Sequence, residues 1–227
     1  MPQSDKIMKQ KKSKMEIKTP TYYRQEFRGP LAYLYDFSFK LITLGRDKKL
    51  RAIFLMHIPK KNRNILDMAT GTGAVACIIK KYIPNASVIG IDLSNTMLSI
   101  AKAKAQRQNY EISFLLENIE RTNFKNSQFD AITLSFGLHE LPLEHRKNIF
   151  KEAHRLLKKG GRFIIMDFNN PRNILLRWLL YFHIFLAEKY AKSLLEQDLE
   201  KEMQKIKYQT FKKIHYGGLV QVVIGKK

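Results

Sequence analysis

The sequence predicts an α/β fold with a doubly wound, mostly parallel sheet of seven strands, helices on both faces, and an antiparallel hairpin at the C-terminal end. Three observations lead to this prediction. Apolar strand-like runs alternate with helical stretches between residues 64 and 168. A glycine-rich turn follows the first of these runs. Near the C-terminus, two more strand-like runs, TFKKIHY and LVQVVIG, are joined by Gly217 and Gly218, which is a typical hairpin signal.

The central elements follow from the spacing of their apolar residues. Five runs have the composition of buried strands: 64–68, 87–91, 112–116, 129–135 and 162–168. Three helices are expected between them, over 73–82, 95–106 and 142–158. Ser94 suits the N-cap of the second helix, Pro142 the first turn of the third, and Gly160 its C-terminal stop. Strands joined by crossover helices pair in parallel, so the sheet is predicted to be Rossmann-like.

The flanking regions complete the predicted domain organisation. Residues 1–20 carry six lysines and few large apolar groups, so we expect a basic, disordered tail. Residues 21–227 are expected to form a single domain with four parts. These parts are a helical cap over 21–60, which gives an N-terminal helical cover, a core over 61–168, a helical lid over 169–207 and the hairpin over 208–227.

Composition restricts the class of protein. The single cysteine, Cys77, excludes an internal disulfide framework and a Cys-rich zinc site, and no metal is expected. Lysine and arginine number 41 against 20 acidic residues, which gives a formal charge of +21. This charge favours contact with phosphates of nucleic acid or anionic lipid, although solubility alone also accounts for it. The single cysteine fits a reducing setting and no apolar segment follows the basic N-terminus, so the expected location is cytoplasmic, with peripheral membrane contact as an extension.

A cofactor site is indicated at the ends of the first two strands. Asp67, Gly71 and Gly73 form the pattern D-x-x-x-G-x-G, in which glycine lets the backbone turn tightly and approach a ligand. Asp92 ends the second strand, where a carboxylate accepts hydrogen bonds from a ribose diol. The pattern fits both S-adenosylmethionine and a nicotinamide dinucleotide. Asp67 favours the cationic sulfonium over a pyrophosphate, and the short chain and terminal hairpin also count against a dinucleotide.

Four segments in the chain carry a more specific resemblance: ILDMATGTGAVA, VIGIDLSNTML, ENIERTNFKNSQFDAITLSFGLHEL and HRLLKKGGRFIIMDF. Together they resemble the class I S-adenosylmethionine-dependent methyltransferases, and most of all the ubiquinone/menaquinone biosynthesis C-methyltransferase group. The similarity covers roughly residues 35–168. It implies a methyltransferase whose cofactor is S-adenosylmethionine.

The resemblance also implies which residues hold this cofactor. The methionine moiety would be surrounded by Asp67, Ala69, Gly71, Thr72 and Gly73. Asp92 would hold the ribose, and the adenine would lie against Leu93, Met97, Asn118 and Ile119. Ser135 and Phe136 would line the cleft after the fourth strand. For Asn118 and Ser135 the simpler interpretations are a loop-capping amide and a strand-end hydroxyl.

The acceptor side departs from the pattern of this group. The segment SFGL is followed by His139 and Glu140 where the group has Arg-Asn, Ile119 replaces an alanine, and Asn123 replaces a proline. His139 and Glu140 are therefore the candidate catalytic residues, because a base at this position can take a proton from the acceptor. Further candidates are His145, for which an exposed helix position is the simpler interpretation, and the tyrosines Tyr22, Tyr23 and Tyr35.

The predicted function is methyl transfer to a small or lipid-like acceptor, of the quinone-precursor or phospholipid type. Residues 174–190, ILLRWLLYFHIFLAEKY, are apolar nearly all round but too short, with an early arginine, for a membrane span. They form either a lid helix on the cleft or a membrane-facing helix that admits a lipid-like acceptor. Two alternatives stay open, an RNA-directed methyltransferase and a non-catalytic binding protein with this fold.

Overall fold

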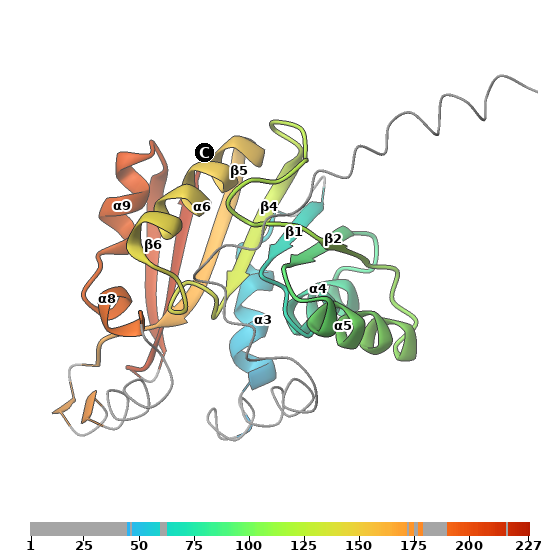
Figure 1. Cartoon of the computed structure of the whole chain (residues 1–227), viewed down its shortest axis with the longest axis horizontal. Coiled ribbons are helices and arrows are strands. Elements are labelled where there is room, and N and C mark those ends of the chain that lie inside the picture. The colour runs from blue at the N-terminus through green and yellow to red at the C-terminus, as the bar shows by residue number, and fades with distance from the viewer. Residues whose placement is uncertain are drawn as a thin grey trace, which may run out of the picture.

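One seven-stranded sheet organises the computed structural model, which describes residues 45, 47–59, 63–171, 173, 174, 177, 178, 190–216 and 218–227. The strand order is β3-β2-β1-β4-β5-β7-β6 (Figure 1). The strands are β1 (Asn64–Met68), β2 (Ser87–Asp92), β3 (Ser113–Leu116), β4 (Phe129–Ser135), β5 (Leu157–Phe168), β6 (Gln209–Tyr216) and β7 (Val220–Lys226). Strands β1 to β5 are parallel, and β7 lies antiparallel between β5 and β6. The predicted fold class is confirmed.

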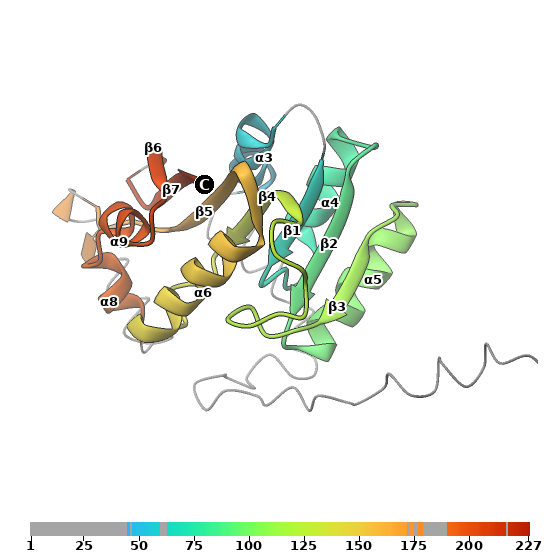
Figure 2. The same ribbon diagram turned by 90° about the horizontal axis from the view of Figure 1, so that it is seen from above.

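Helices cover both faces of this sheet (Figure 2). One face carries α3 (Asp47–His57), α4 (Ala74–Tyr82) and α5 (Asn95–Arg107). The other carries α6 (Leu143–Leu156), α8 (Ala191–Leu195) and α9 (Leu199–Lys205). The expected tail over 1–20, and most of the expected cap over 21–60 and of the apolar segment over 174–190, lie outside the described residues.

The alternation of side chains along the strands divides the interior into two cores. Ile65 and Ile164 point toward α3, α4 and α5, whereas Leu66, Phe163 and Val223 point toward α6 and α9. All five side chains are buried. Neighbouring residues of a strand face opposite sides of a sheet, so burial on both sides requires a continuous apolar run. This requirement is the reason why the central strands lack the polar alternation of an exposed sheet.

The boundary between α6 and β5 differs from the sequence-based expectation. The helix ends at Leu156 and β5 begins at Leu157, five residues before the predicted start of this strand. Gly160, with φ +79°, therefore lies inside the strand and not at a helix stop. The reason is additional pairing, since Leu157 pairs with Phe129 and the Gly160 N–H donates to the Lys227 carbonyl across 2.8 Å. A register shift next to Phe129 accommodates the extra residues.

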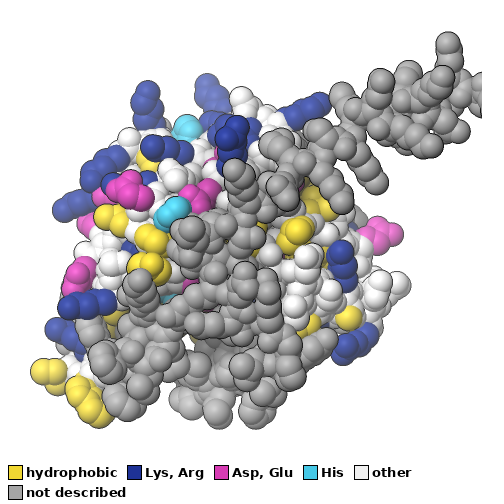
Figure 3. All heavy atoms as spheres, in the orientation of Figure 1, with side chains coloured by type: hydrophobic (Ala, Val, Ile, Leu, Met, Phe, Trp, Pro, Cys, Tyr) yellow, Lys and Arg dark blue, Asp and Glu magenta, His cyan; other side chains and the backbone are white. Residues whose placement is uncertain are grey.

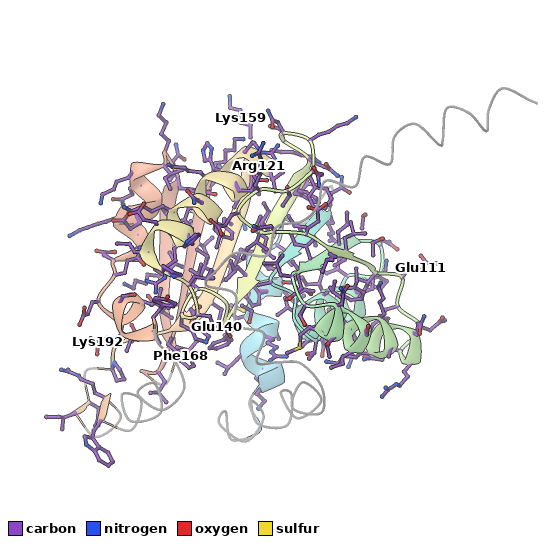
Figure 4. All side chains as sticks on the ribbon, in the orientation of Figure 1. Glu111, Arg121, Glu140, Lys159, Phe168 and Lys192 are labelled. Carbon is purple, nitrogen blue, oxygen red and sulfur yellow. The ribbon has the colours of Figure 1, made fainter. Side chains whose placement is uncertain are left out.

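The carboxyl ends of the parallel strands meet at one edge of the sheet, and this edge positions the candidate site. Figure 4 shows Glu140 and Phe168 at this edge, just after β4 and at the end of β5. Arg121 and Lys159 lie at the opposite edge. In open α/β sheets, ligands bind outside the carboxyl ends of the strands. The loops that follow β1, β2, β3 and β4 are therefore the part of the fold where function is expected.

Candidate active site

The turn after β1 is a loop of unusual backbone conformation that closes onto β2. Ala69, Gly71 and Gly73 all have positive φ angles, of 50°, 53° and 73°. The Thr70 N–H donates to the Ile91 carbonyl, and the Gly73 N–H donates to the Thr70 carbonyl, both across 2.9 Å. The first bond attaches the loop to β2 and the second closes its turn. Helix α4 begins directly after the loop, at Ala74, so its first backbone N–H groups point toward this edge.

The two glycines of the loop have different roles. A Cβ at Gly73 would lie 2.8 Å from the Ala101 Cβ and 3.0 Å from the Phe114 ring, so α5 and β3 leave no room for a side chain there. A Cβ at Gly71 would meet no heavy atom within 4 Å among the described residues. Gly73 is thus required by packing, whereas Gly71 is the point at which a ligand can approach the backbone closely. A loop with this space above it fits a cofactor held by backbone groups.

Asp67 holds this loop in place through hydrogen bonds to its side chain. Its side chain is buried, and its two carboxylate oxygens accept hydrogen bonds of 2.6 Å from the hydroxyls of Thr133 and Thr70. Burial raises the pKa of Asp67 from 3.8 to about 6, although both hydroxyl bonds oppose this shift. The carboxylate therefore ties β1 to β4 and to the glycine loop. Both oxygens of this carboxylate are hydrogen-bonded within the protein.

Asp92 connects the glycine loop with the end of β2. Its Oδ2 accepts a hydrogen bond of 2.8 Å from the Gly71 N–H, and its Oδ1 accepts one of 2.9 Å from the Ser94 N–H. Burial raises the pKa of this carboxyl group, and the backbone bonds lower it. Each oxygen of a carboxylate accepts more than one bond, so both oxygens keep capacity for a ribose hydroxyl. Leu93 follows on the chain, and buried Met97 donates its N–H to the Ser94 hydroxyl, the N-cap of α5.

The other residues that were assigned to the cofactor lie at the same edge, in varied surroundings. Thr72 is buried, and its hydroxyl accepts a hydrogen bond of 3.1 Å from Lys104. The Asn118 Oδ1 accepts the Glu120 N–H at 2.9 Å, which is the bond that a loop-capping amide makes. Ile119 points into the core that α6 covers. Thr72 and Ile119 are thus buried, whereas Asn118 is half-buried.

The loop after β4 carries the remaining predicted residues. Ser135 is the last residue of β4 and is half-buried. Phe136 has a positive φ of 52°, and its N–H donates to the Met166 carbonyl across 2.8 Å. Its ring packs edge to face on that of Phe168, with 5.4 Å between centroids. The loop therefore leaves β4 in a fixed direction, against the end of β5.

His139 lies on this loop and is fixed by an acid that the sequence reasoning did not single out. Its Nδ1 is 2.8 Å from Oδ1 of Asp167, a fully buried residue near the end of β5. The imidazole ring packs edge to face on Phe168, with 4.7 Å between centroids. Its Nε2 is 3.9 Å from a carboxylate oxygen of Glu140. The signal that could have revealed Asp167 is its position, a charged residue ending an apolar parallel strand.

Arg146 is the second residue that sequence reasoning missed. It is fully buried on α6, and its guanidinium donates to the Leu138 carbonyl, to Gln197, to the Tyr190 carbonyl and to the Ser193 hydroxyl. Burial lowers the pKa of Arg146 to about 10, and the charge of Asp167 partly opposes this shift. A local sequence pattern gives no signal for this role, because the partners lie far away along the chain.

The other base candidates are placed less favourably. His145 lies on α6 as expected, but it is half-buried and not exposed, and its Nδ1 is 2.8 Å from Oε2 of Glu120. The same oxygen accepts a hydrogen bond of 3.0 Å from the Asn148 amide. His145 thus joins α6 to the loop after β3. Tyr22, Tyr23 and Tyr35 lie outside the described residues. Within the described part of the chain, no group of three His, Cys, Asp or Glu side chains is arranged to hold a metal ion.

Comparisons with known proteins give the family. Residues 22–215 match the ubiE/COQ5 methyltransferase family. The chain is 31% identical, over 89% of its length and 95% of the relative, to the ubiquinone/menaquinone biosynthesis C-methyltransferase UbiE of Geotalea uraniireducens. It is 34% identical, over 62% of its length and 64% of the relative, to a demethylmenaquinone methyltransferase of Thermus thermophilus.

Solved structures share the fold at lower identity. One is the phospholethanolamine N-methyltransferase 2 of Haemonchus contortus in complex with phosphomonomethylethanolamine and S-adenosylhomocysteine. It superposes with a TM-score of 0.64 at 14% identity, over 79% of this chain and 52% of that one. With the glycine loop and Asp92 in place and the match covering residues 22–215, the chain belongs to the ubiE/COQ5 methyltransferase family and is an S-adenosylmethionine-dependent methyltransferase.

Proposed function

We propose that this enzyme methylates a carbon atom of a quinone precursor, with His139 as the base. The observation that carries the proposal is the buried pair of His139 and Asp167, 2.8 Å apart, at the edge of the sheet where the glycine loop lies. The relatives from Geotalea uraniireducens and Thermus thermophilus support the acceptor class, since one is named a ubiquinone/menaquinone biosynthesis C-methyltransferase and the other a demethylmenaquinone methyltransferase.

The donor site is proposed to use the loops after β1, β2 and β3. S-adenosylmethionine, when bound, supplies a methyl group on a positively charged sulfur. The backbone at Gly71 would approach the methionine end, because no described heavy atom occupies the position of its missing Cβ. Asp92 would accept hydrogen bonds from the ribose hydroxyls, and Leu93 and Met97 would lie beside the adenine. Asp67 would act through Thr70 and Thr133, by holding the loop in shape.

The acceptor would lie between this donor site and the loop after β4. A methyl transfer of this kind is an in-line displacement that depends mainly on holding the reacting atoms in line. The acceptor carbon would bond to the methyl carbon, the electron pair of the broken carbon–sulfur bond would stay with the departing donor, and the acceptor proton would pass to His139. Glu140, with an oxygen 3.9 Å from His139 Nε2, stabilises the imidazolium that this proton transfer creates.

The proposal is tested in two steps. Calorimetry with S-adenosylmethionine is expected to show saturable binding. If the protein does not bind S-adenosylmethionine, the proposed donor site is wrong. Transfer of a labelled methyl group is then measured with a demethylated naphthoquinol, a phospholipid extract and RNA. We expect label on a carbon of the naphthoquinol only. Label in lipid or RNA, with none in the quinol, would replace the proposed acceptor by one of those classes.

A second proposal concerns peripheral contact with an anionic membrane. We infer it from Ile174 and Trp178, which are helical and 82% and 64% exposed, and from the formal charge of +21. We call these two exposed side chains the apolar patch. No helix among the described residues is long and apolar enough to span a membrane. Figure 3 shows exposed hydrophobic side chains at the lower left corner and many Lys and Arg side chains along the left and upper edges.

Co-sedimentation with lipid vesicles tests this contact. The protein is expected to pellet with phosphatidylglycerol vesicles and not with phosphatidylcholine vesicles, and high salt is expected to weaken binding. The variant Ile174→Ser/Trp178→Ser should bind less, whereas Tyr82→Ser, another exposed side chain on a distant helix, should bind like the wild type. Failure to bind any vesicle, or equal binding by both variants, would exclude the apolar patch. Stronger binding to RNA than to vesicles would assign the charge to nucleic acid.

A further inference from the structure

Asp167 contacts two backbone N–H donors and the ring of His139. The residue is fully buried. Its Oδ2 accepts the Leu138 N–H at 2.9 Å, and its Oδ1 accepts the Phe168 N–H at 2.8 Å and lies 2.8 Å from the His139 Nδ1. Both oxygens of Asp167 therefore act as hydrogen-bond acceptors for the backbone.

This state of Asp167 determines where the proton of His139 lies. A neutral imidazole carries one proton, on either Nδ1 or Nε2. Because both oxygens of Asp167 accept backbone N–H groups, we assign Nδ1 of His139 as the donor in the 2.8 Å bond to Oδ1. The lone pair is then on Nε2, the nitrogen on the side of Glu140. A histidine in this tautomer presents Nε2 as the proton acceptor.

The backbone that carries His139 is held from two sides. The backbone N–H of Leu138 donates to Asp167, and the Leu138 carbonyl accepts a hydrogen bond of 3.0 Å from Nε of Arg146. Arg146 is anchored in turn by the Tyr190 carbonyl and the Ser193 hydroxyl, each at 2.8 Å. The imidazole is thus fixed by its backbone as well as by its ring nitrogen, which limits its rotation.

The aromatic side chains complete the position of the ring. Phe168 packs edge to face on His139 and also on Phe136, with 4.7 Å and 5.4 Å between centroids. Glu140 and Phe168 lie together at the edge of the sheet that carries the glycine loop (Figure 4). Nε2 of His139 therefore belongs to the edge where the acceptor is proposed to bind. The ring thus lies between Phe168 and the side chain of Glu140.

We propose that Asp167 is a positioning residue for methyl transfer: its carboxylate holds His139 in the tautomer with the proton on Nδ1, so that Nε2 receives the proton of the acceptor. The methyl acceptor in this inference rests on the proposed function. The tautomer of His139 does not depend on it, because it follows from the contacts of Asp167 alone. A tautomer measurement therefore separates a failure of this inference from a failure of the proposed acceptor.

The first experiment measures the tautomer in the intact protein. Long-range proton–nitrogen correlation spectra of ¹⁵N-histidine-labelled protein are recorded at about pH 8.5, above the usual imidazole pKa. The His139 signals are identified by their loss in His139→Gln. We expect the Nδ1-protonated form in the wild type. In Asp167→Asn a neutral amide replaces the carboxyl group and its nitrogen must take the place of one of the two accepting oxygens, so the share of the Nδ1-protonated form should fall. An Nε2-protonated His139 in the wild type would overturn the proposal.

The second experiment measures turnover with the naphthoquinol acceptor. Asp167→Asn is expected to lower kcat roughly 10²- to 10⁴-fold, the range found for wrongly oriented general bases. The affinity for S-adenosylmethionine should stay unchanged, because Asp167 does not contact the donor loops. The matched control is Asp130→Asn, the same change at an acid that pairs with Lys158 at the opposite end of β4. It should retain both the wild-type tautomer and the wild-type turnover.

The outcomes are distinguishable. Wild-type turnover by a folded Asp167→Asn would overturn the positioning role, whatever its spectrum. If Asp167→Asn does not fold, the wild-type spectrum still decides the tautomer, and His139→Gln tests the base with a side chain that can keep a hydrogen bond to Asp167. If no variant and no wild-type protein methylates the quinol while the Nδ1-protonated form is present, the acceptor proposal fails and the tautomer assignment stands.

Discussion

The backbone N–H of Gly71 donates a hydrogen bond to Oδ2 of Asp92 across 2.8 Å, and this contact joins the glycine loop after β1 to the end of β2. The other oxygen of Asp92 accepts the Ser94 N–H at the start of α5. One carboxylate thus joins two loops of the proposed donor site through bonds within the protein itself.

Asp92→Asn is expected to weaken S-adenosylmethionine binding about 10- to 100-fold. The amide nitrogen of the variant would face one of two backbone donors, Gly71 or Ser94, and the ribose would lose a charged acceptor. Calorimetric titration measures this loss. Asp130→Asn, a matched change near the start of β4, is expected to bind with wild-type affinity. An unchanged affinity in Asp92→Asn would contradict the role of this carboxylate.

Two alanine substitutions separate packing from ligand approach in the glycine loop. Gly73→Ala is expected to reduce the free energy of unfolding by about 2–4 kcal/mol, because its Cβ collides with Ala101 and Phe114 at a positive φ. Gly71→Ala has only the backbone strain, about 1 kcal/mol, but its Cβ enters the ligand space and should lower cofactor affinity about 10-fold or more. Urea unfolding and calorimetry measure the two effects. Wild-type affinity in Gly71→Ala would disprove the ligand-facing role of Gly71.

Asp67 should make folding stability decrease with rising pH. Its pKa is 3.8 when unfolded and about 6 when folded, so between these values the folded state binds more protons than the unfolded state. The relative unfolding free energy of Asp67→Asn should therefore rise by roughly 3 kcal/mol between about pH 4 and pH 7, from a shift of about two pKa units. Urea unfolding of both proteins at several pH values measures the difference. Parallel curves would show that Asp67 ionises at its ordinary pKa.

Arg146 joins the loop of His139 to α8, and its loss should destabilise the fold. Arg146→Lys keeps the charge but cannot reach Leu138, Tyr190 and Ser193 together, because an ammonium lacks the planar fork of a guanidinium. We expect a loss of roughly 2–4 kcal/mol of unfolding free energy. Arg121→Lys, on an exposed loop, should change it by less than about 0.5 kcal/mol. Equal stability of the two variants would contradict the anchoring role.

The fold class and the donor loop could be predicted from sequence because their signals are local. The apolar runs of β1, β2 and β4, the N-cap Ser94 and the hairpin before β7 each depend on neighbouring residues. The predicted start of β5 was wrong by five residues, because the start of this strand depends on pairing with Phe129 and with the C-terminal Lys227. Strand pairing is a non-local term that local propensity does not contain.

In the candidate acceptor site, too, one residue could be predicted from the sequence and its contact partners could not. The position of His139 after the fourth strand was readable from the chain, since the residues following a parallel strand lie at the functional edge of the sheet. Its partner was not readable: Asp167 is 28 residues farther on, and the carbonyl that anchors Arg146 at Tyr190 is 44 residues beyond that arginine. Both contacts arise when β4 and β5 pair and α8 packs beside α6.

The sequence by itself determined the kinds of elements, their order and the residues offered to the cofactor, because hydrophobic period and turn chemistry act over a few residues. Only the tertiary structure decided what those residues do. Folding buries Asp67 between Thr70 and Thr133, although Thr133 is 66 residues away along the chain. It also places Asp167 in contact with His139. A carboxylate is a brace, a ribose acceptor or a partner of a base according to the donors around it, and folding supplies those donors.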